Sequence, residues 1–345
     1  KISDSFSLMY KKVQEEHKYE IHTHFLRSGF SKRKDYQHAC EAMITDIADA
    51  KYIFLNESSD VIAALPMRKE TIVTQLWHGC GAFKKFGMST AELIFGDDRK
   101  TLEKYPYHGN YTYVTVSSPE VVWAYEEAMS LQDKKGVVVP TGISRSDIFY
   151  DEEAKKAAQE KLFSVVPQAK GKKVILYAPT FRGRVAKAKT PNQLDIAAFG
   201  DALGKDYILL FKLHPFVKKR TAIPEGYEDF AFDLTDDMSI EELLFVADIC
   251  ISDYSSLVFE YSLFEKPMIF FAFDLDNYYD WRGFYYDYKD FVPGPIHTTT
   301  EEMIEYIQHV DERFDKKKVQ EFRQKFMSAC DGHATERIMK MMFGE

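Results

Sequence analysis

The sequence has little cysteine, no long apolar run and no secretory signal, and each absence excludes a class of protein. Its 4 Cys residues are widely spaced and none forms a CxxC pair, so a disulfide framework or a structural zinc site is not expected. No apolar run approaches the roughly 20 residues that a membrane-spanning helix needs. The chain begins at Lys1, without a Met and without a signal peptide. We therefore expect a soluble protein of the reducing cytoplasm.

Several common functional motifs are also missing. The absence of Walker A, GxGxxG, HExxH and GxSxG patterns disfavours nicotinamide chemistry and covalent serine hydrolysis. No grouping of His, Asp and Glu resembles a metal site, so we expect no metal and no other cofactor. The 45 Lys and Arg against 54 Asp and Glu leave a net charge of −9, which disfavours nucleic acid as a partner.

The charge is distributed unevenly along the chain. Residues 168–220 contain 12 Lys and Arg but only 3 acidic residues, a local charge of +9 that leaves −18 for the remainder. These cations flank short apolar runs and do not recur every three or four residues. The pattern favours an anion-binding site, with a solvated helix face as the alternative.

Strand and helix patterns alternate through both halves of the chain. At 345 residues, with 45% hydrophobic residues, the sequence predicts two domains. Expected helices include 35–50, 118–131, 151–163, 239–247 and 255–264, with a last helix at about 315–342 that could return to the first domain. Expected strands are 51–57, 70–78, 111–118, 136–142, 172–180, 206–214, 247–253 and 266–273. Two successive series of this kind predict an α/β fold with parallel sheets covered by helices.

Ligands of open parallel sheets bind beyond the carboxyl ends of the strands, and His78 lies at such an end. It is followed by two glycines that allow a close turn and by two cations, namely Gly79, Gly81, Lys84 and Lys85. An imidazole beside exposed amides and cations suits a general base that acts on a hydroxyl next to a phosphate. The alternative is a buried structural histidine bonded to its own loop.

Two further strand ends, in the second half, carry cations and a histidine. Thr180, Arg182 and Arg184 follow the run 172–180, and arginine can bind phosphate oxygens through two hydrogen bonds. His214 ends the run 206–214 shortly after Lys212. A single LHP tripeptide is weak evidence, since most such histidines satisfy local hydrogen bonds. Two histidines at two strand ends, one in each half, are stronger evidence.

A serine cluster marks the turn from the strand 247–253 into the next helix. Ser252, Ser255 and Ser256 bring hydroxyls and free N–H groups together, which predicts a phosphate or diphosphate site. The alternative is ordinary helix capping by Ser255. Glu260, one helical turn further, could accept hydrogen bonds from ribose hydroxyls. The aromatic run 277–296 is more typical of a core than of a platform for base stacking.

These motifs occur in an order that resembles the CDP-glycerol glycerophosphotransferase family of teichoic acid and capsule biosynthesis. The segments are TQLWHG…KKFG, LYAPTFRG, KLHP, ISDYSSLVFEYSLFEKPMIFF, RGFYYDYKDFVPGPI and CDGHATER, and the resemblance covers about 50–340. It implies a GT-B architecture, with a Rossmann-like acceptor domain at 1–146, a Rossmann-like donor domain at 147–345 and the active site in the cleft between them. It also implies transfer of a polyol phosphate from a CDP-polyol, with release of CMP.

The resemblance also implies roles for individual residues. His78 matches the proposed base of the WHG motif, and His214 matches the histidine beside the donor diphosphate. Arg145 and Asp147 match a segment at the crossing between the domains. Residues expected to line the donor site are Gly79, Arg145, Pro179, Thr180, Arg182, Lys212, Ser252, Ser255, Ser256 and Glu260, while Lys84 and Lys85 are expected to bind acceptor or phosphate.

The expected acceptor is a lipid-linked (polyprenyl diphosphate) saccharide or polyol phosphate. The resemblance therefore implies that the protein associates peripherally with the inner face of the cell membrane. The GAFKKFG form is closer to short, primase-like members than to long polymerases. CDP-ribitol in place of CDP-glycerol, a GT-B glycosyltransferase using a nucleotide sugar, and a non-catalytic nucleotide- or lipid-binding assembly partner remain alternatives.

Overall fold

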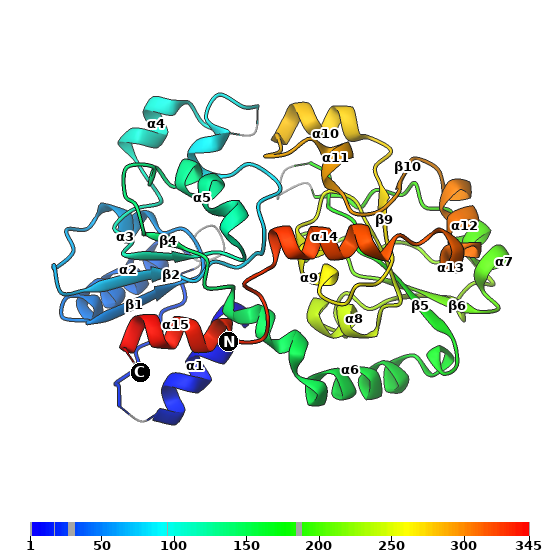
Figure 1. The fold of residues 1–345 in the computed structure, drawn as a ribbon, viewed down its shortest axis with the longest axis horizontal. Helices are drawn as coiled ribbons and strands as arrows, with labels where there is room; N and C mark the ends of the chain where they lie inside the picture. The colour runs from blue at the N-terminus through cyan, green and yellow to red at the C-terminus, as the bar shows by residue number, and fades with distance from the viewer. Residues whose placement is uncertain (1, 17, 27–31, 95, 184–187, 345) are drawn as a thin grey trace. The chain divides into compact units, whose positions relative to one another are not determined.

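The computed structural model describes residues 2–16, 18–26, 32–94, 96–183 and 188–344. The chain forms two compact units, each built on its own sheet (Figure 1). The first unit contains Lys1–Gly79, Lys85–Asp147 and Ser328–Glu345, and the second contains Cys80–Lys84 and Ile148–Met327. Relative to the expected domains 1–146 and 147–345, these units differ mainly at 80–84 and at 328–345. No helix among the described residues is both long and apolar enough to cross a membrane.

The sheet of the first unit has four strands, and every pair of neighbours runs parallel. The order follows the sequence: β1 (Tyr52–Leu55), β2 (Ile72–Gln75), β3 (Tyr113–Thr115) and β4 (Val138–Val139). The carboxyl ends of all four strands therefore share one edge of the sheet. The residues that follow each strand, among them His78 after β2 and Arg145 after β4, belong to this edge.

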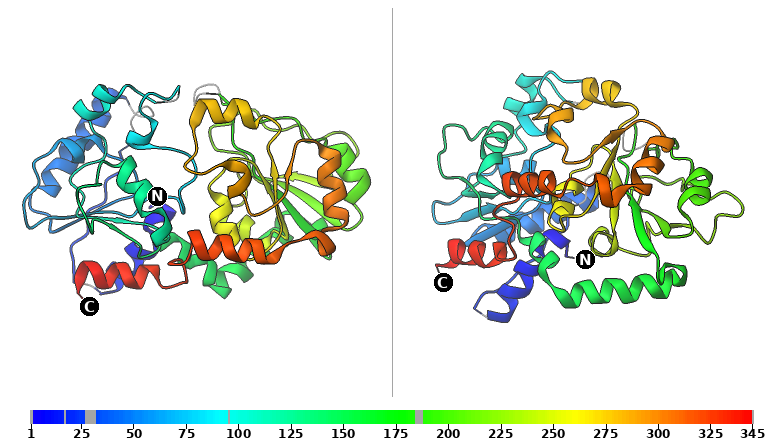
Figure 2. Two further views of the ribbon diagram at one scale, coloured as in Figure 1. Left: turned by 45° about the horizontal axis from the view of Figure 1, so that its top comes forward. Right: turned by 45° about the vertical axis from the view of Figure 1, so that its right-hand side comes forward.

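Within the described residues of the first unit, six α-helices connect or cover these strands: α1 (Asp4–Glu16), α2 (Arg33–Ile47), α3 (Asp60–Ala64), α4 (Arg99–Lys104), α5 (Val122–Ala128) and α15 (Ala334–Phe343). The two terminal helices, α1 and α15, lie side by side (Figures 1 and 2). Met9 of α1 and Ile338 of α15 pack in one cluster with Leu76, which follows β2. The chain terminus thus supports the strand that leads to His78.

The expected last helix at 315–342 is wrong, because the structure has two helices in its place. They are α14 (Lys316–Phe326), in the second unit, and α15, in the first. The chain turns between them, and Gly332 there has a φ of 90°, which no helix accommodates. The amphipathic pattern continues across the turn, so periodicity alone does not reveal the break.

The sheet of the second unit is also parallel throughout, with six strands in the order β10-β9-β8-β5-β6-β7. The strands are β5 (Lys173–Tyr177), β6 (Tyr207–Phe211), β7 (Ala231–Asp233), β8 (Ile249–Ser252), β9 (Met268–Phe271) and β10 (Ile296–His297). The central strands match the expected runs and confirm the α/β fold class. The short edge strands β7 and β10 were not expected, since two or three residues leave no alternation to detect.

Helices bury both faces of this sheet: α6 (Glu152–Val165), α7 (Ile196–Leu203), α8 (Ile240–Val246), α9 (Leu257–Ser262), α10 (Leu275–Arg282), α11 (Tyr288–Phe291), α12 (Thr300–Gln308), α13 (Val310–Arg313) and α14. Alternate strand residues such as Ile175 and Leu209 pack against α7 and α12 in one large cluster. Their neighbours Val174 and Ile208 are equally buried. Burial on both faces explains why these strands read as continuous apolar runs.

Two local predictions for the second unit, a capping box and a buried aromatic run, are confirmed. Ser239 and Glu242 form the expected capping box at the start of α8, each binding the backbone N–H of the other. The aromatic run belongs to the core as expected, with Phe284, Tyr288 and Phe291 at most 7% exposed.

Replacement of Ile338 by Ala should destabilise the first unit by about 2–5 kcal/mol, because the fully buried side chain fills the cluster beneath β2. Hydrogen exchange of the α1 amides, measured at increasing urea concentration, reports the loss in free energy of unfolding of this unit. The matched control is Lys340→Ala on the exposed face of the same helix. Equal effects of the two changes would contradict the packing of α15 against the sheet.

Candidate active site

A network of neutral groups orients the turn that carries His78. Gln75, the last residue of β2, is fully buried, and its amide nitrogen donates to the Glu57 carbonyl oxygen at 2.9 Å. Its side-chain oxygen accepts from the Trp77 amide at 3.0 Å. Trp77 has a φ of 59°, a left-handed backbone conformation that bulky residues rarely adopt. The expected turn therefore depends on Trp77 and on Gly81 (φ 65°), and Gly79 has no left-handed φ.

The hydrogen bonds of His78 determine which ring nitrogen carries its proton. Nδ1 lies 2.9 Å from the Asn56 carbonyl oxygen and 3.4 Å from a carboxylate oxygen of Glu57. Because a carbonyl oxygen can only accept, Nδ1 carries the hydrogen, and in the neutral ring Nε2 keeps its lone pair. The side chain is 42% exposed, and its contacts with Asn56 and Glu57 use Nδ1, not Nε2. These are the requirements of a general base.

A second histidine of the first unit was missed at the sequence level. The Trp77 ring lies 4.4 Å from the His78 ring and 5.8 Å from the ring of His108, centroid to centroid. His108 Nδ1 lies 2.9 Å from the Tyr111 hydroxyl. Burial, together with the nearby His78, lowers the pKa of His108 to about 4, so this ring is neutral at physiological pH. His108 does not follow a predicted strand, so no sequence pattern indicated it as a candidate site residue.

Residues 80–84 bring a cation into the second unit. The Phe83 ring packs between Phe284 and Phe291, with centroid distances of 5.1 and 4.8 Å, and the Phe83 carbonyl accepts from the Tyr285 amide. A Cβ at Gly81 would lie 2.2 Å from the Phe259 ring, so the close approach requires glycine. Lys84, expected to bind acceptor or phosphate, belongs with these residues to the second unit. Lys85 returns to the first unit and is partly exposed.

His214 has the opposite tautomer to His78. The Phe216 backbone N–H lies 3.2 Å from His214 Nδ1, and an amide can only donate. Nδ1 therefore accepts, and in the neutral ring Nε2 carries the hydrogen. Burial and the charge of Lys84 lower the pKa of His214, which favours this neutral form. Flanked by the rings of Phe181 and Phe216, His214 can donate from Nε2 to an anionic oxygen.

The serine cluster divides into one structural residue and two that are more open. Ser252 is buried, and its hydroxyl donates to the Ala178 carbonyl at 2.8 Å, which ties β8 to the end of β5. Ser255 is partly exposed and Ser256 is exposed, at the start of α9. Glu260 is only 6% exposed within the same helix. Of this group, Ser255 and Ser256 have the accessibility that a ligand requires.

Arg182, expected to bind donor phosphate, is held by two carboxylates of its own unit. Its guanidinium donates to Asp274 at 2.6 and 2.9 Å and lies 3.0 Å from Asp253. It also donates to the Thr180 carbonyl, while the Thr180 amide donates to Asp253. Tyr254 adds a hydrogen bond to Asp274. These contacts make Arg182 the centre of an ion-pair network that shapes the loop after β5, which contains Pro179 and Thr180.

Lys212 likewise has backbone partners. Its ammonium donates to the carbonyl oxygens of Thr235 and Met238, at 2.8 and 2.5 Å, between β7 and α8. Burial lowers the pKa of Lys212. Lys212 thus stabilises a loop beside His214. Arg184, the other cation expected after β5, lies outside the described residues.

A comparison with known protein families finds a match that includes both units. The family described as CDP-Glycerol:Poly(glycerophosphate) glycerophosphotransferase matches residues 1–344. The chain belongs to this family. No three His, Cys, Asp or Glu side chains in the described part of the chain are arranged to hold a metal ion.

Two similar curated proteins come from Bacillus spizizenii. A teichoic acid poly(ribitol-phosphate) polymerase is 38% identical over 340 residues, which cover 98% of this chain and 54% of the relative. A teichoic acid ribitol-phosphate primase is 36% identical over 343 residues and is covered to 86%. The teichoic acid glycerol-phosphate primase of Bacillus subtilis is 29% identical over 300 residues, covering 85% of this chain and 74% of the relative. The chain thus spans about half the length of the first of these relatives.

Solved structures support the fold. The wall teichoic acid polymerase TagF, soaked with CDPG, has a TM-score of 0.79 at 22% identity, covering 99% of this chain and 85% of that chain. A UDP-N-acetylglucosamine 2-epimerase has a TM-score of 0.57 at 11% identity, covering 97% and 85%. The two-sheet α/β fold is therefore GT-B-like, as the resemblance implied.

Replacement of Arg182 by Met should destabilise the second unit by about 3–5 kcal/mol, because Asp253, which is 2% exposed, would lose its cation. Hydrogen exchange of the β5 and β8 amides measures the loss. The control is Arg220→Met, whose partner Asp236 is 79% exposed and whose ion pair contributes below about 1 kcal/mol. A fully stable Arg182→Met protein with impaired donor binding would instead return Arg182 to the donor site.

Proposed function

We propose that the chain transfers ribitol phosphate from CDP-ribitol to a hydroxyl of a lipid-linked teichoic acid precursor, with release of CMP. The single observation that carries the catalytic part is His78, whose Nδ1–H is bound to the Asn56 carbonyl so that Nε2 can take a proton. Membership of a polyol-phosphate transferase family gives the reaction class. The similarity to ribitol-phosphate enzymes supports the choice of ribitol.

The two histidines have complementary roles in the proposed reaction. His78 Nε2 removes the proton of the acceptor hydroxyl as its oxygen attacks the β-phosphorus of the donor, and the bond to the CMP phosphate breaks. His214 donates its Nε2–H to a donor phosphate oxygen and so stabilises the charge that develops there. Lys84, Ser255 and Ser256 are the further groups that we propose for the donor phosphates. The proton ends on His78, and the electron pair leaves with CMP.

Ribitol is preferred to glycerol on sequence similarity. The ribitol-phosphate relatives are 38% and 36% identical to this chain, and the glycerol-phosphate primase is 29% identical. This gradient favours ribitol over the glycerol expected at the sequence level. The acceptor is proposed to be a polyprenyl diphosphate-linked saccharide, reached peripherally at the cytoplasmic face of the membrane. The transfer is proposed to need no metal, with His and Lys side chains stabilising the charge.

A donor screen tests the substrate assignment. With synthetic lipid-linked disaccharide, either bare or primed with glycerol phosphate, we expect faster CMP release from CDP-ribitol than from CDP-glycerol, in the presence of EDTA. UDP release from a UDP-sugar would indicate a glycosyltransferase. Tight donor binding with no CMP release on either acceptor would indicate a non-catalytic partner. Activity that returns only with added magnesium would overturn the metal-free mechanism.

Replacement of His78 by Ala should lower kcat by about 10²–10⁴-fold, the usual contribution of a general base. The rate of CMP release with saturating donor and acceptor measures it. The control is His38→Ala, which removes an exposed histidine from α2 in the same unit. Near-normal turnover of a folded His78→Ala protein would show that another group takes the proton.

A further inference from the structure

Arg145 was expected to bind the donor, yet one of its hydrogen bonds in the structure is to the residue proposed as the base. Its guanidinium Nη1 donates to the backbone carbonyl oxygen of His78 at 2.7 Å, and both residues belong to the first unit. We propose that Arg145 is a positioning residue that holds the peptide of His78, and that the C-terminal segment 329–337 holds the loop that carries Arg145. The inference deepens the proposed function and rests on it, because it takes His78 as the base.

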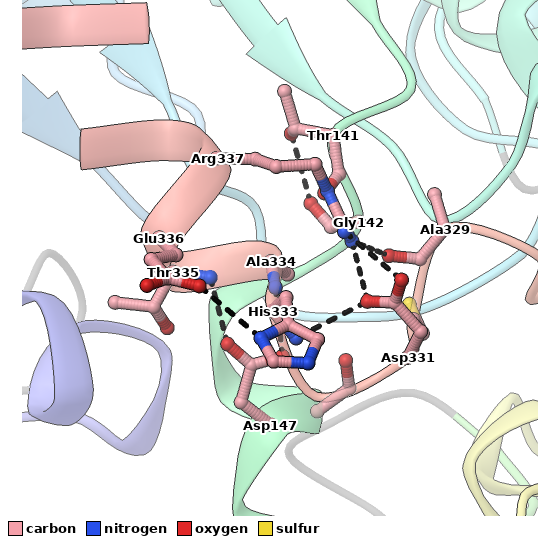
Figure 3. A network of polar contacts seen from close by, with 12 residues as sticks. Thr141, Gly142, Asp147, Ala329, Asp331, His333, Ala334, Thr335, Glu336 and Arg337 are labelled. Carbon is pink, nitrogen blue, oxygen red and sulfur yellow. Dashed lines mark hydrogen bonds and ion pairs between the residues drawn. The ribbon is translucent and has the colours of Figure 1, made fainter. Parts of the chain in front are cut away.

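The C-terminal helix binds one end of this loop through Asp147. The two carboxylate oxygens of Asp147 accept from the backbone N–H groups of Ala334 and Thr335, at 3.0 and 2.7 Å (Figure 3). These are free amides of the first turn of α15, where a negative charge is favoured. The hydroxyls of Ser144 and Thr335 also share a hydrogen bond of 2.8 Å. Asp147 and Ser144 flank Arg145, so both of its sides are tied to α15.

The other end of the loop is held by Arg337 and by a close backbone contact. Arg337 Nε donates to the Thr141 carbonyl at 2.8 Å, and its remaining nitrogens bind Asp331 and the Ala329 carbonyl (Figure 3). Gly142 has a φ of 85°, and a Cβ there would lie 2.1 Å from the Ala329 carbonyl oxygen. Segment 141–147 is thus fixed against the C-terminal segment along its length.

Two restraints then act on His78 from different sides. Asn56 holds the ring through Nδ1, and Arg145 holds the carbonyl, so the direction of Nε2 is defined relative to the sheet. The preceding residue, Trp77, has the left-handed φ of 59°, which persists only where the surroundings enforce it. Loss of the Arg145 bond would let the 78–79 peptide rotate. A displacement of about 1 Å at a reacting group can cost about 10²-fold in rate.

The kinetic test compares variants of Arg145 that keep or remove the N–H group that binds the His78 carbonyl. Arg145→Met keeps the length and apolar stem, and we expect kcat to fall by about 10²-fold with the KM for CDP-ribitol nearly unchanged. Arg145→Lys retains an N–H donor and should recover part of the loss. The matched control is Arg68→Met, because Arg68 also donates to a backbone carbonyl of the first unit, that of Ala48, and should leave both parameters unchanged. A raised KM with normal kcat would overturn the proposal and assign Arg145 to the donor.

A spectroscopic readout separates this inference from the proposed function. In protein with ¹⁵N-labelled histidine at alkaline pH, His78 should show the Nδ1–H tautomer, and Arg145→Met should shift it toward a mixture. Asp147→Asn, which weakens the bonds to α15, should shift it in the same direction by less. An unchanged tautomer in Arg145→Met would overturn the positioning role. The spectrum requires no turnover. A tautomer shift in Arg145→Met together with an active His78→Ala protein would therefore refute His78 as the general base but support the positioning of His78 by Arg145.

Discussion

The parallel direction of every strand in both sheets is the constraint on which the candidate site depends. Strands that all run the same way place their carboxyl ends on one edge, and each must be followed by a connection across a face of the sheet. His78 and Arg145 follow two strands of the first sheet, and His214 and the serines follow two strands of the second. In the first unit this joins His78 and Arg145, far apart in sequence, through a hydrogen bond. The helices bury both faces of the second sheet, so a ligand can bind at the edge formed by the carboxyl ends of the strands.

Backbone groups, more than side chains, determine what the two histidines can do. A carbonyl oxygen at Asn56 requires a hydrogen on His78 Nδ1, and an amide at Phe216 excludes one from His214 Nδ1. One ring is left with an accepting Nε2 and the other with a donating Nε2. A peptide group cannot change from donor to acceptor, so each backbone partner selects one tautomer of the neutral ring. The division between proton acceptor and hydrogen-bond donor is thus built into the loops.

The cations of the second unit show that charge in the sequence does not reveal which partners a cation has. The excess of Lys and Arg between 168 and 220 surrounds His214 in the sequence and favours an anion-binding site. However, Arg182 is paired with Asp253 and Asp274, more than 70 residues away, and Lys212 binds two carbonyl groups. A partly buried cation must recover the solvation it loses, and nearby carboxylates and carbonyls provide that recovery before any ligand does.

Sequence alone determined the fold class, the central strands, the capping box of α8 and the family, because hydrophobic period and short ordered motifs are local properties. It also located His78 and His214 at strand ends. Only the tertiary structure decided the break between α14 and α15, the membership of 80–84 in the second unit, the buried His108 and the bond from Arg145 to His78. Each of these depends on contacts between residues distant in the chain, and no local pattern records which groups such contacts bring together.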